Sequence, residues 1–241
     1  MGRVSYWIKS LPGGTTALRG LRGLLNAGRK PAEQPPFPGS AEYWRERYEY
    51  GRDSGLGSYG VLADFKARVL NAFFGQHGVR SVIEFGCGDG NQLGMLNVSD
   101  YTGIDISPQA LALCRERYGG VAGRRFLLAD EYSDEEADCA LSLDVIYHLV
   151  EDETFDAYMR RLFAAAQRYV VVYSSNRLPD GTENTGEHVR HRRFTDWVEA
   201  NEPAWTLIQH VPNEHPFRGD YRTGSFADFY FFEKTEPDIQ T

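Results

Sequence analysis

The sequence predicts an α/β fold in which a mostly parallel sheet carries helices on both faces. Apolar runs of strand length alternate with helical segments between residues 80 and 173, which is typical of parallel strands joined by helical crossovers. The first run, Arg80–Gly86, is largely apolar and ends in glycine, as expected for a buried parallel strand. Two alternating segments with no helix between them follow near the end, and they predict an antiparallel pair at one sheet edge.

Two helices and a loop are expected ahead of the sheet. Ala41–Tyr50 is rich in charged and aromatic residues and predicts a helix. Gly51–Gly60 is a glycine-rich loop. Val61–His77 has the apolar spacing of a second, amphipathic helix.

The strands of the sheet are expected at seven apolar or alternating runs. They are Arg80–Gly86, Tyr101–Ile106, Phe126–Ala129, Cys139–Leu143, Tyr169–Tyr173, Trp205–Val211 and Ser225–Glu233. A helix should begin at Pro108, because Ser107 can cap it and proline is favoured at the first helical position. The alanine-rich segment Asp152–Arg168 predicts a further helix.

The charge divides the chain into two parts. The net charge is −8, yet residues 1–40 hold six basic side chains against one acid, together with five of the 11 prolines. We therefore predict a basic, Pro/Gly-rich arm at 1–40, in which Thr16–Asn26 has the spacing of a short amphipathic helix, and one domain at 41–241. Because the body is acidic, it lacks the basic footprint of nucleic-acid binders, and we expect no nucleic-acid partner.

Composition excludes further classes of protein. Hydrophobic residues make up 41% of the chain, which is enough for a sizeable core and argues against wholesale disorder. No apolar stretch reaches the roughly 18 residues of a membrane span, so no integral membrane segment is expected. Glycines interrupt the leucines near the N-terminus, which argues against a secretory signal. The three cysteines form no C-x-x-C pair and fit free thiols in a reducing cytoplasm, where we expect the protein.

The richest motif is Val82–Leu93, VIEFGCGDGNQL, in which a strand ends, three glycines follow at alternate positions, and a helix is expected to begin. Glycine allows a sharp turn and lets a ligand approach the main chain. The spacing is GxGxG rather than the GxGxxG of dinucleotide sites, and Glu84 just before it would repel a pyrophosphate. A ligand with an ammonium or sulfonium group would instead be attracted to Glu84.

Two further acids continue this pattern. Asp105 ends the next strand, 21 residues beyond Glu84, where a carboxylate can accept hydrogen bonds from both hydroxyls of a ribose. Asp130 ends the strand after that, at a position suited to the amino group of an adenine. The series indicates a nucleoside with a positively charged, amino-acid-like end.

The motifs EFGCGDG, GID, LLAD and SLDVIYHL resemble those of the class I S-adenosylmethionine-dependent methyltransferases, and the resemblance runs from about Ser40 to the C-terminus. It implies a doubly wound, Rossmann-like, seven-stranded sheet with an antiparallel last strand. It also implies S-adenosylmethionine as cofactor. The residues that would bind it are Tyr59, Glu84, Gly86, Cys87, Gly88, Gly90, Asp105, Ile106, Asp130, Glu131 and Asp144.

The segment Ser54–Leu70, SGLGSYGVLADFKARVL, is similar to segments that precede the glycine loop in bacterial methyltransferases associated with sugar and polysaccharide modification. The similarity implies that residues 41–78 supply N-terminal helices and a cofactor lid, with Tyr59 in the lid. Closure of such a lid excludes water from the reaction. The alternative interpretation is an irregular connector.

Asp144, Tyr147 and His148 form the first candidate group for the acceptor site. They follow the fourth strand at the carboxyl edge of the sheet, where doubly wound folds bind ligands. His148 is expected to act as general base near neutral pH, or else to be a capping or solvated side chain. Asp144 is expected to assist catalysis by touching the cofactor or holding a divalent ion, and Tyr147 to contact the acceptor.

The second candidate group lies in GEHVRHRRF, after the fifth strand, and comprises Glu187, His188, His191 and Arg192. The histidines are three residues apart, a spacing that can place both on one helical face as metal ligands or a base pair. We expect a catalytic role for His191 and acceptor binding by His188, His191 and Arg192. A surface loop is the alternative.

Magnesium is an optional second cofactor. Some O-methyltransferases of this fold hold magnesium with acids after the fourth and fifth strands. Asp144 matches the first of these, but the fifth strand ends in YSSN and offers Asn176 instead of an acid. His148 or Glu187 would have to complete the ligand set.

These observations favour an O-methyltransferase that acts on a hydroxyl of a small acceptor, with a sugar or oligosaccharide preferred. A natural-product phenol, amine or carboxylate is the second interpretation. A third is a catalytically inactive, cofactor-binding partner subunit, and a fourth is an NAD oxidoreductase. The aromatic tail and the proline-rich arm leave room for a homodimer.

Overall fold

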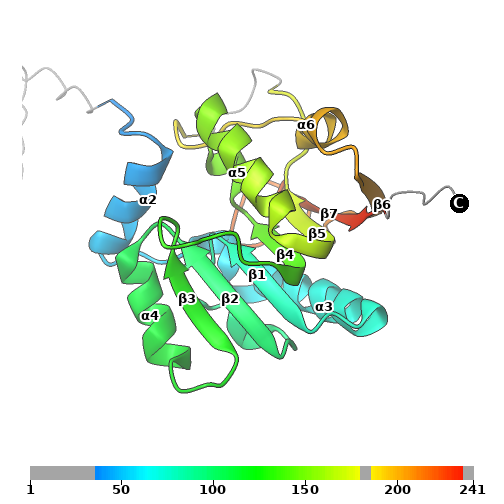
Figure 1. The fold of residues 1–241 in the computed structure, drawn as a ribbon. Coiled ribbons are helices and arrows are strands. Elements are labelled where there is room, and N and C mark those ends of the chain that lie inside the picture. The colour runs from blue at the N-terminus through cyan, green and yellow to red at the C-terminus, as the bar shows by residue number, and fades with distance from the viewer. Residues whose placement is uncertain (1–35, 180–185, 236–241) are drawn as a thin grey trace, which may run out of the picture. The chain divides into compact units, whose positions relative to one another are not determined.

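The computed structural model describes residues 36–179 and 186–235. Their centre is a seven-stranded sheet in the order β3-β2-β1-β4-β5-β7-β6, which runs from left to right in Figure 1. The strands are β1 (Ser81–Phe85), β2 (Asp100–Asp105), β3 (Arg124–Leu128), β4 (Ala137–Leu143), β5 (Ala166–Ser174), β6 (Trp205–Val211) and β7 (Asp228–Lys234). Strands β1 to β5 are parallel, and β7 lies antiparallel between β5 and β6. The predicted sheet with an antiparallel last strand is confirmed.

Helices cover both faces of the sheet, as predicted. They are α2 (Ser40–Glu49), α3 (Gly60–His77), α4 (Pro108–Tyr118), α5 (Asp152–Ala164) and α6 (Phe194–Asn201). Residues of α3 and α4 share one core cluster with Val171 of β5, whereas residues of α5 and α6 share the other with Val172. Successive strand residues point to opposite faces, so the buried run in β5 feeds both clusters.

The expected cap of α4 is present, because the Ser107 Oγ accepts a hydrogen bond from the Ala110 N–H at 3.3 Å. The predicted helix after the glycine loop is wrong. Only a 3₁₀ turn, Leu93–Met95, lies between Gly90 and β2. The stretch 91–99 is shorter than the dozen or so residues of a helical crossover. Its apolar side chains instead join the core cluster that α3 lines.

The alanine-rich helix is shorter than predicted. Helix α5 ends at Ala164, and Ala166–Arg168 open strand β5. Ala166 pairs with Ala137 of β4, so pairing within the sheet overrides the local helix preference. Helix α6 was not expected from the sequence, although Phe194 and Val198, four residues apart, supply its buried face.

The expectations for residues 1–35, including the helix at Thr16–Asn26, lie outside the described residues. Among the helices that the structure describes, none is both long and apolar enough to cross a membrane.

Candidate functional site

A cavity of about 580 Å³ lies at the carboxyl ends of the central parallel strands, at the edge where doubly wound sheets bind ligands. Its walls come from α2, the loop after α2, α3, the ends of β1 to β4, and α5. The volume suits a small molecule or cofactor. The lining contains the acids Glu84, Asp89, Asp105, Asp144 and Glu153 and the bases Lys66, His148 and Arg161.

The glycine loop lies along one side of this cavity. Gly86 and Gly88 have positive φ angles of 81° and 57°, a conformation that glycine adopts without strain. A Cβ added to Gly86 would also lie 2.5 Å from the Val145 Cγ2, so the loop and the β4 end approach closely. Backbone conformation and packing therefore both require glycine at position 86.

Asp105 is held by the backbone at the end of β2. Its carboxylate accepts hydrogen bonds from the Gly88 N–H at 2.9 Å and the Ser107 N–H at 2.9 Å. Burial raises the pKa of Asp105, and these backbone donors oppose that shift. Each carboxylate oxygen keeps a further lone pair, so Asp105 can still accept hydrogen bonds from a ligand in the cavity.

Glu84 is buried in β1 and faces the same cavity. Burial raises its pKa to about 7, although the Tyr101 hydroxyl donates a hydrogen bond to it and Lys66 lies close enough to oppose the shift. Near neutral pH the side chain is therefore poised between the acid and the carboxylate. A cationic group bound beside it would favour the carboxylate.

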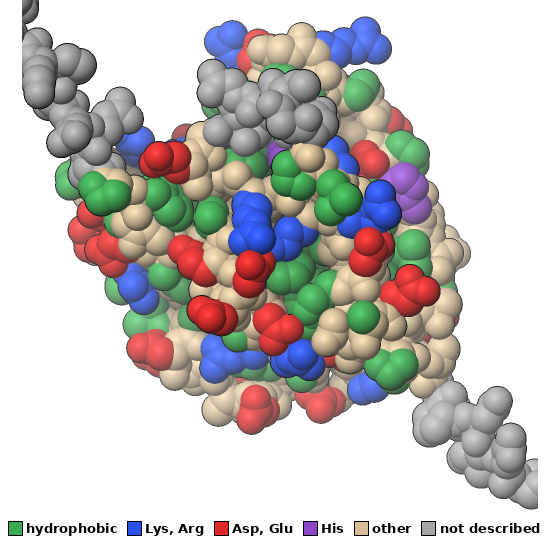
Figure 2. Space-filling model, turned by 90° about the horizontal axis from the view of Figure 1, so that it is seen from above, with side chains coloured by type: hydrophobic (Ala, Val, Ile, Leu, Met, Phe, Trp, Pro, Cys, Tyr) green, Lys and Arg blue, Asp and Glu red, His purple; other side chains and the backbone are tan. Residues whose placement is uncertain are grey.

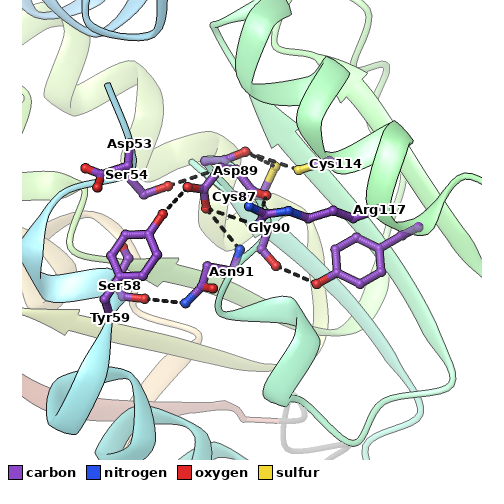
Figure 3. Close-up of polar contacts among 12 residues, drawn as sticks. Asp53, Ser54, Ser58, Tyr59, Cys87, Asp89, Gly90, Asn91, Cys114 and Arg117 are labelled. Carbon is purple, nitrogen blue, oxygen red and sulfur yellow. Dashed lines mark hydrogen bonds and ion pairs between the residues drawn. The ribbon is translucent and has the colours of Figure 1, made fainter. Parts of the chain in front are cut away.

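The segment Ser54–Tyr59 is fastened to the glycine loop, as Figure 3 shows. The Asp89 N–H donates to the Ser54 Oγ at 3.0 Å, and the Tyr59 hydroxyl donates to the Asp89 carboxylate. The Asn91 side-chain amide donates to the Ser58 carbonyl at 2.7 Å. This segment therefore lies over the loop in the position that a lid requires.

Cys87 and Cys114 lie beside the loop (Figure 3), and both are buried free thiols. The Cys114 Sγ donates to the Gly88 carbonyl at 3.2 Å. The contact with Cys114 and burial together raise the pKa of Cys87 well above its usual value. Cys87 is thus a protonated, unreactive part of the cavity wall.

An ion pair lies at the β4 end of the cavity. The Lys66 Nζ of α3 is 2.7 Å from the Asp144 Oδ2, and the other carboxylate oxygen accepts a hydrogen bond from the Tyr147 hydroxyl at 2.8 Å. Asp144 has a φ of 60°, which is rare for a residue other than glycine and is often found at functional sites. Sequence reasoning missed Lys66, yet its i, i+4 spacing from Leu62 and Leu70 places it on the buried face of α3.

Two histidines lie against α2. The His148 Nδ1 donates to the His188 carbonyl at 2.9 Å, and the rings of these two histidines are stacked with centroids 5.4 Å apart. Tyr43 stacks on His188 at 4.6 Å, and Trp44 meets the edge of His148 at 4.8 Å. Burial lowers the pKa of His148 to about 4, so its imidazole is uncharged near neutral pH.

Aromatic rings continue outward from Tyr147. Phe226 packs against it at 5.0 Å, Tyr221 lies 6.1 Å from Phe226, and Phe217 stacks on Tyr221 at 4.2 Å. Phe217 and Tyr221 are both exposed. These four rings, which we call the aromatic path, run from the surface to Tyr147, whose hydroxyl bonds to Asp144, but none of the four lines the cavity.

The structure does not bring every predicted cofactor residue to the cavity. Among the predicted set, those that line it are Glu84, Gly86, Cys87, Gly88, Asp105, Ile106 and Asp144. Tyr59 and Gly90 do not line the cavity. Tyr59 bonds to Asp89 of the lining, and Gly90 contributes a positive φ to the turn of the glycine loop. Asp130 and Glu131 are exposed, and their neighbour Ala129 lines the cavity in their place.

His191 and Arg192 also lie away from the cavity lining. His191 is buried, with its Nδ1 2.7 Å from the Ser175 Oγ and its ring against Phe226. Arg192 donates to the Leu149 carbonyl at 2.6 Å and pairs with Asp152 at 3.0 Å. It therefore fastens the segment after β5 to the segment after β4.

The neighbouring Arg190 also pairs with Asp152, at 3.0 Å. Asp152 thus offsets part of the positive charge of Arg190 and Arg192 within the protein. On the face shown in Figure 2, basic and acidic side chains likewise lie interspersed.

The proposed magnesium ligands do not come together. Both Asp144 oxygens already have donors, and the Asn176 side chain is bonded to Thr195, with its amide nitrogen 2.9 Å from the Thr195 Oγ1. In the described parts of the chain, no group of three or more His, Cys, Asp or Glu side chains is arranged to hold a metal. These residues therefore do not fit a magnesium ion.

The comparisons with known proteins agree with this geometry. Residues 83–170, which contain the glycine loop, Asp105 and Asp144, match a family described as a methyltransferase domain. No curated protein matches the chain.

Several solved structures share the fold. Magnesium protoporphyrin IX methyltransferase from Synechocystis with bound S-adenosylmethionine is 12% identical and has a TM-score of 0.62, over 84% of this chain and 100% of that one. N-methyltransferase NodS from Bradyrhizobium japonicum with S-adenosylhomocysteine is 16% identical with a TM-score of 0.64, over 82% and 99%. The methyltransferase domain of a bacterial Hen1 is 19% identical with a TM-score of 0.56, over 76% and 100%.

At these identities the structural similarity establishes the fold alone. The family match, over residues 83–170, adds a methyltransferase domain within that fold, and structures of the fold have been solved with S-adenosylmethionine and S-adenosylhomocysteine bound. The cavity fits such a cofactor, because it combines a glycine loop of positive φ with buried carboxylates at the ends of β1 and β2.

We predict that Glu84→Gln stabilises the cofactor-free protein at pH 8 and weakens S-adenosylmethionine binding. A folded-state pKa raised to about 7 means that ionised Glu84 destabilises the fold as the pH rises from its usual value of 4.5. The gain on substitution should approach about 3 kcal/mol at pH 8 and shrink towards zero below pH 5. Thermal melts at several pH values and calorimetric titration measure the two effects. Glu199→Gln, an exposed acid on α6, is the control, and an equal response in both variants would contradict the assignment.

We predict that Arg192→Ala lowers stability by about 1–3 kcal/mol but leaves cofactor affinity unchanged, because the side chain fastens two loops and does not line the cavity. Chemical denaturation and cofactor titration separate the two effects. A large loss of cofactor affinity without loss of stability would instead place Arg192 in the binding site.

Proposed function

We propose that this methyltransferase transfers the methyl group of S-adenosylmethionine to a hydroxyl of a small, sugar-like acceptor. The observation that carries the proposal is the β4 end of the cavity, where Trp44 and the uncharged His148 line the wall beside Asp144, whose carboxylate accepts a hydrogen bond from the Tyr147 hydroxyl. An aromatic face and a few polar groups are what a hydroxylated ring needs for binding.

We assign the remainder of the cavity to the cofactor. Glu84 would hold the ammonium group, Asp105 would accept from the ribose hydroxyls, and Ile106 and Ala129 would pack on the adenine. Bound S-adenosylmethionine supplies a methyl group on a positively charged sulfur. The protein then has to align an acceptor with that methyl group and remove one proton.

The charge of the cavity favours a neutral acceptor. Acids outnumber Lys66 and Arg161 in the lining, and Lys66 is already paired with Asp144. An anionic carboxylate would therefore be repelled. A neutral hydroxyl is not repelled in this way, and its proton becomes acidic only as its oxygen bonds to the methyl group.

His148 is our candidate for the proton acceptor. Because its Nδ1–H is donated to the His188 carbonyl, its Nε2 carries the lone pair. The low pKa keeps this nitrogen unprotonated throughout the physiological range. It is a weak base, which suffices when the proton leaves an oxygen that is already bonding to the methyl group.

The proposal extends to cellular context. Three buried free cysteines fit a reducing cytoplasm, and a sugar acceptor would place the enzyme in polysaccharide biosynthesis. The edge strand β6 exposes Leu207 and Ile208, which suits a homodimer.

Release of S-adenosylhomocysteine with a panel of acceptors tests the function. We expect release with hydroxylated sugars or oligosaccharides, and little with simple amines, phenols or carboxylates. Release that depends only on an amine or a carboxylate would overturn the hydroxyl assignment.

With an active acceptor, we predict that His148→Ala lowers kcat by about 100-fold, the lower end of what a positioned base contributes, and leaves the S-adenosylmethionine Kd within about twofold. The matched control is His210→Ala, an exposed histidine on β6 paired with Asp228. Parallel losses of kcat and cofactor affinity would show that His148 acts only through the shape of the cavity.

A further inference from the structure

Lys66 is a buried cation in the wall of the cavity. Its side chain is 1% exposed, and its Nζ lies 5.3 Å from the Tyr173 ring centroid and 2.7 Å from the Asp144 Oδ2. Arg161, the other non-histidine base in the lining, is exposed and bonded to the Ala129 carbonyl at the opposite end. Lys66 is therefore the cation that acts on the β4 end of the cavity.

Asp144 is fixed in place by contacts on every side. Its N–H donates to the Tyr173 carbonyl at 2.9 Å, and each carboxylate oxygen has one donor, Lys66 or Tyr147. A Cβ added to Gly57 of the lid would lie 3.0 Å from the Asp144 Oδ2, so the lid backbone also closes onto this carboxylate. Removal of Lys66 would leave the carboxylate in position but without its counter-charge.

A buried ion pair adds little to stability compared with apolar residues of the same volume. The Lys66–Asp144 pair also affects the charge of the cavity, because Glu84 lies within electrostatic reach of Lys66. The positive charge therefore reduces the negative potential along the part of the cavity that runs from Glu84 to Asp144.

We propose that Lys66 is a specificity-determining residue, which cancels the charge of Asp144 and so limits how strongly the site prefers positively charged ligands over neutral ones. Without Lys66 the wall would favour the sulfonium cofactor over its neutral thioether product, and an ammonium over a hydroxyl acceptor. The acceptor part of this inference rests on the proposed function, whereas the cofactor part does not.

Calorimetric titration with S-adenosylmethionine and with S-adenosylhomocysteine tests the inference without an acceptor. The readout is the ratio of the two Kd values. Lys66→Met should shift this ratio about tenfold in favour of S-adenosylmethionine, because one positive charge is lost from the wall of the cavity that we assign to the cofactor. Asp144→Asn leaves Lys66 unpaired and should shift the ratio by a similar factor in the opposite direction.

The double variant Lys66→Met/Asp144→Asn removes both charges and should restore the ratio to within about twofold of the wild-type value. Arg68→Met is the matched control. It removes an exposed positive charge two residues along α3, from a side chain paired with Glu214, and should leave the ratio unchanged. If Lys66→Met does not fold, the difference in the Kd ratio between Asp144→Asn and the double variant tests the inference.

A ratio that stays within about twofold of wild type in every folded variant would overturn the inference and leave the proposed function standing. Failure of the wild-type protein to bind either ligand would overturn both. A shifted ratio together with no activity on any hydroxylated acceptor would support the role of Lys66 and remove the hydroxyl assignment alone.

Discussion

Three carboxylates buried at the carboxyl ends of neighbouring strands are the constraint around which the site is built. Glu84, Asp105 and Asp144 lie at the ends of β1, β2 and β4, where the parallel sheet brings them together. Burial of a charge is costly unless the charge is paired. Here two tyrosine hydroxyls, two backbone N–H groups and a lysine provide the partners. The fold therefore creates a negatively charged cavity and supplies only part of the positive charge that would balance it.

One part of that compensation, the charge of Lys66, comes from outside the segment that matches the methyltransferase family. The match covers residues 83–170, yet Lys66 lies on α3, and the segment Ser54–Tyr59 that holds Asp89 lies between α2 and α3. Helix α2 closes the cavity through aromatic stacking on His148 and His188. The elements ahead of the sheet are thus part of the site.

The sequence predicted the sheet and the positions of Glu84 and Asp105 at its cavity edge well, because both follow local rules. Buried parallel strands give apolar runs, and the acids fall at strand ends, where the topology brings them to one edge. The sequence predicted Asp130 and Arg192 less well. A strand end shows that a side chain lies near the edge, but not whether it turns inward, and Asp130 is exposed. Arg192 is fastened by carbonyls of a loop 40 residues away, a long-range contact that no local pattern predicts.

The incomplete compensation of Glu84 links the stability of the fold to its ligand. A carboxyl group with a pKa of about 7 destabilises the protein near neutral pH whenever it ionises without a cation beside it. A bound ammonium group would remove the cost of ionising Glu84. Binding of the ligand should therefore stabilise the folded state by more than its other contacts alone would provide. Lys66 takes over this role only in part, because its Nζ is bonded to Asp144 and its charge opposes the raised pKa of Glu84 without abolishing it. Lys66 and the ammonium group of the ligand therefore compensate different parts of the negative charge in the cavity.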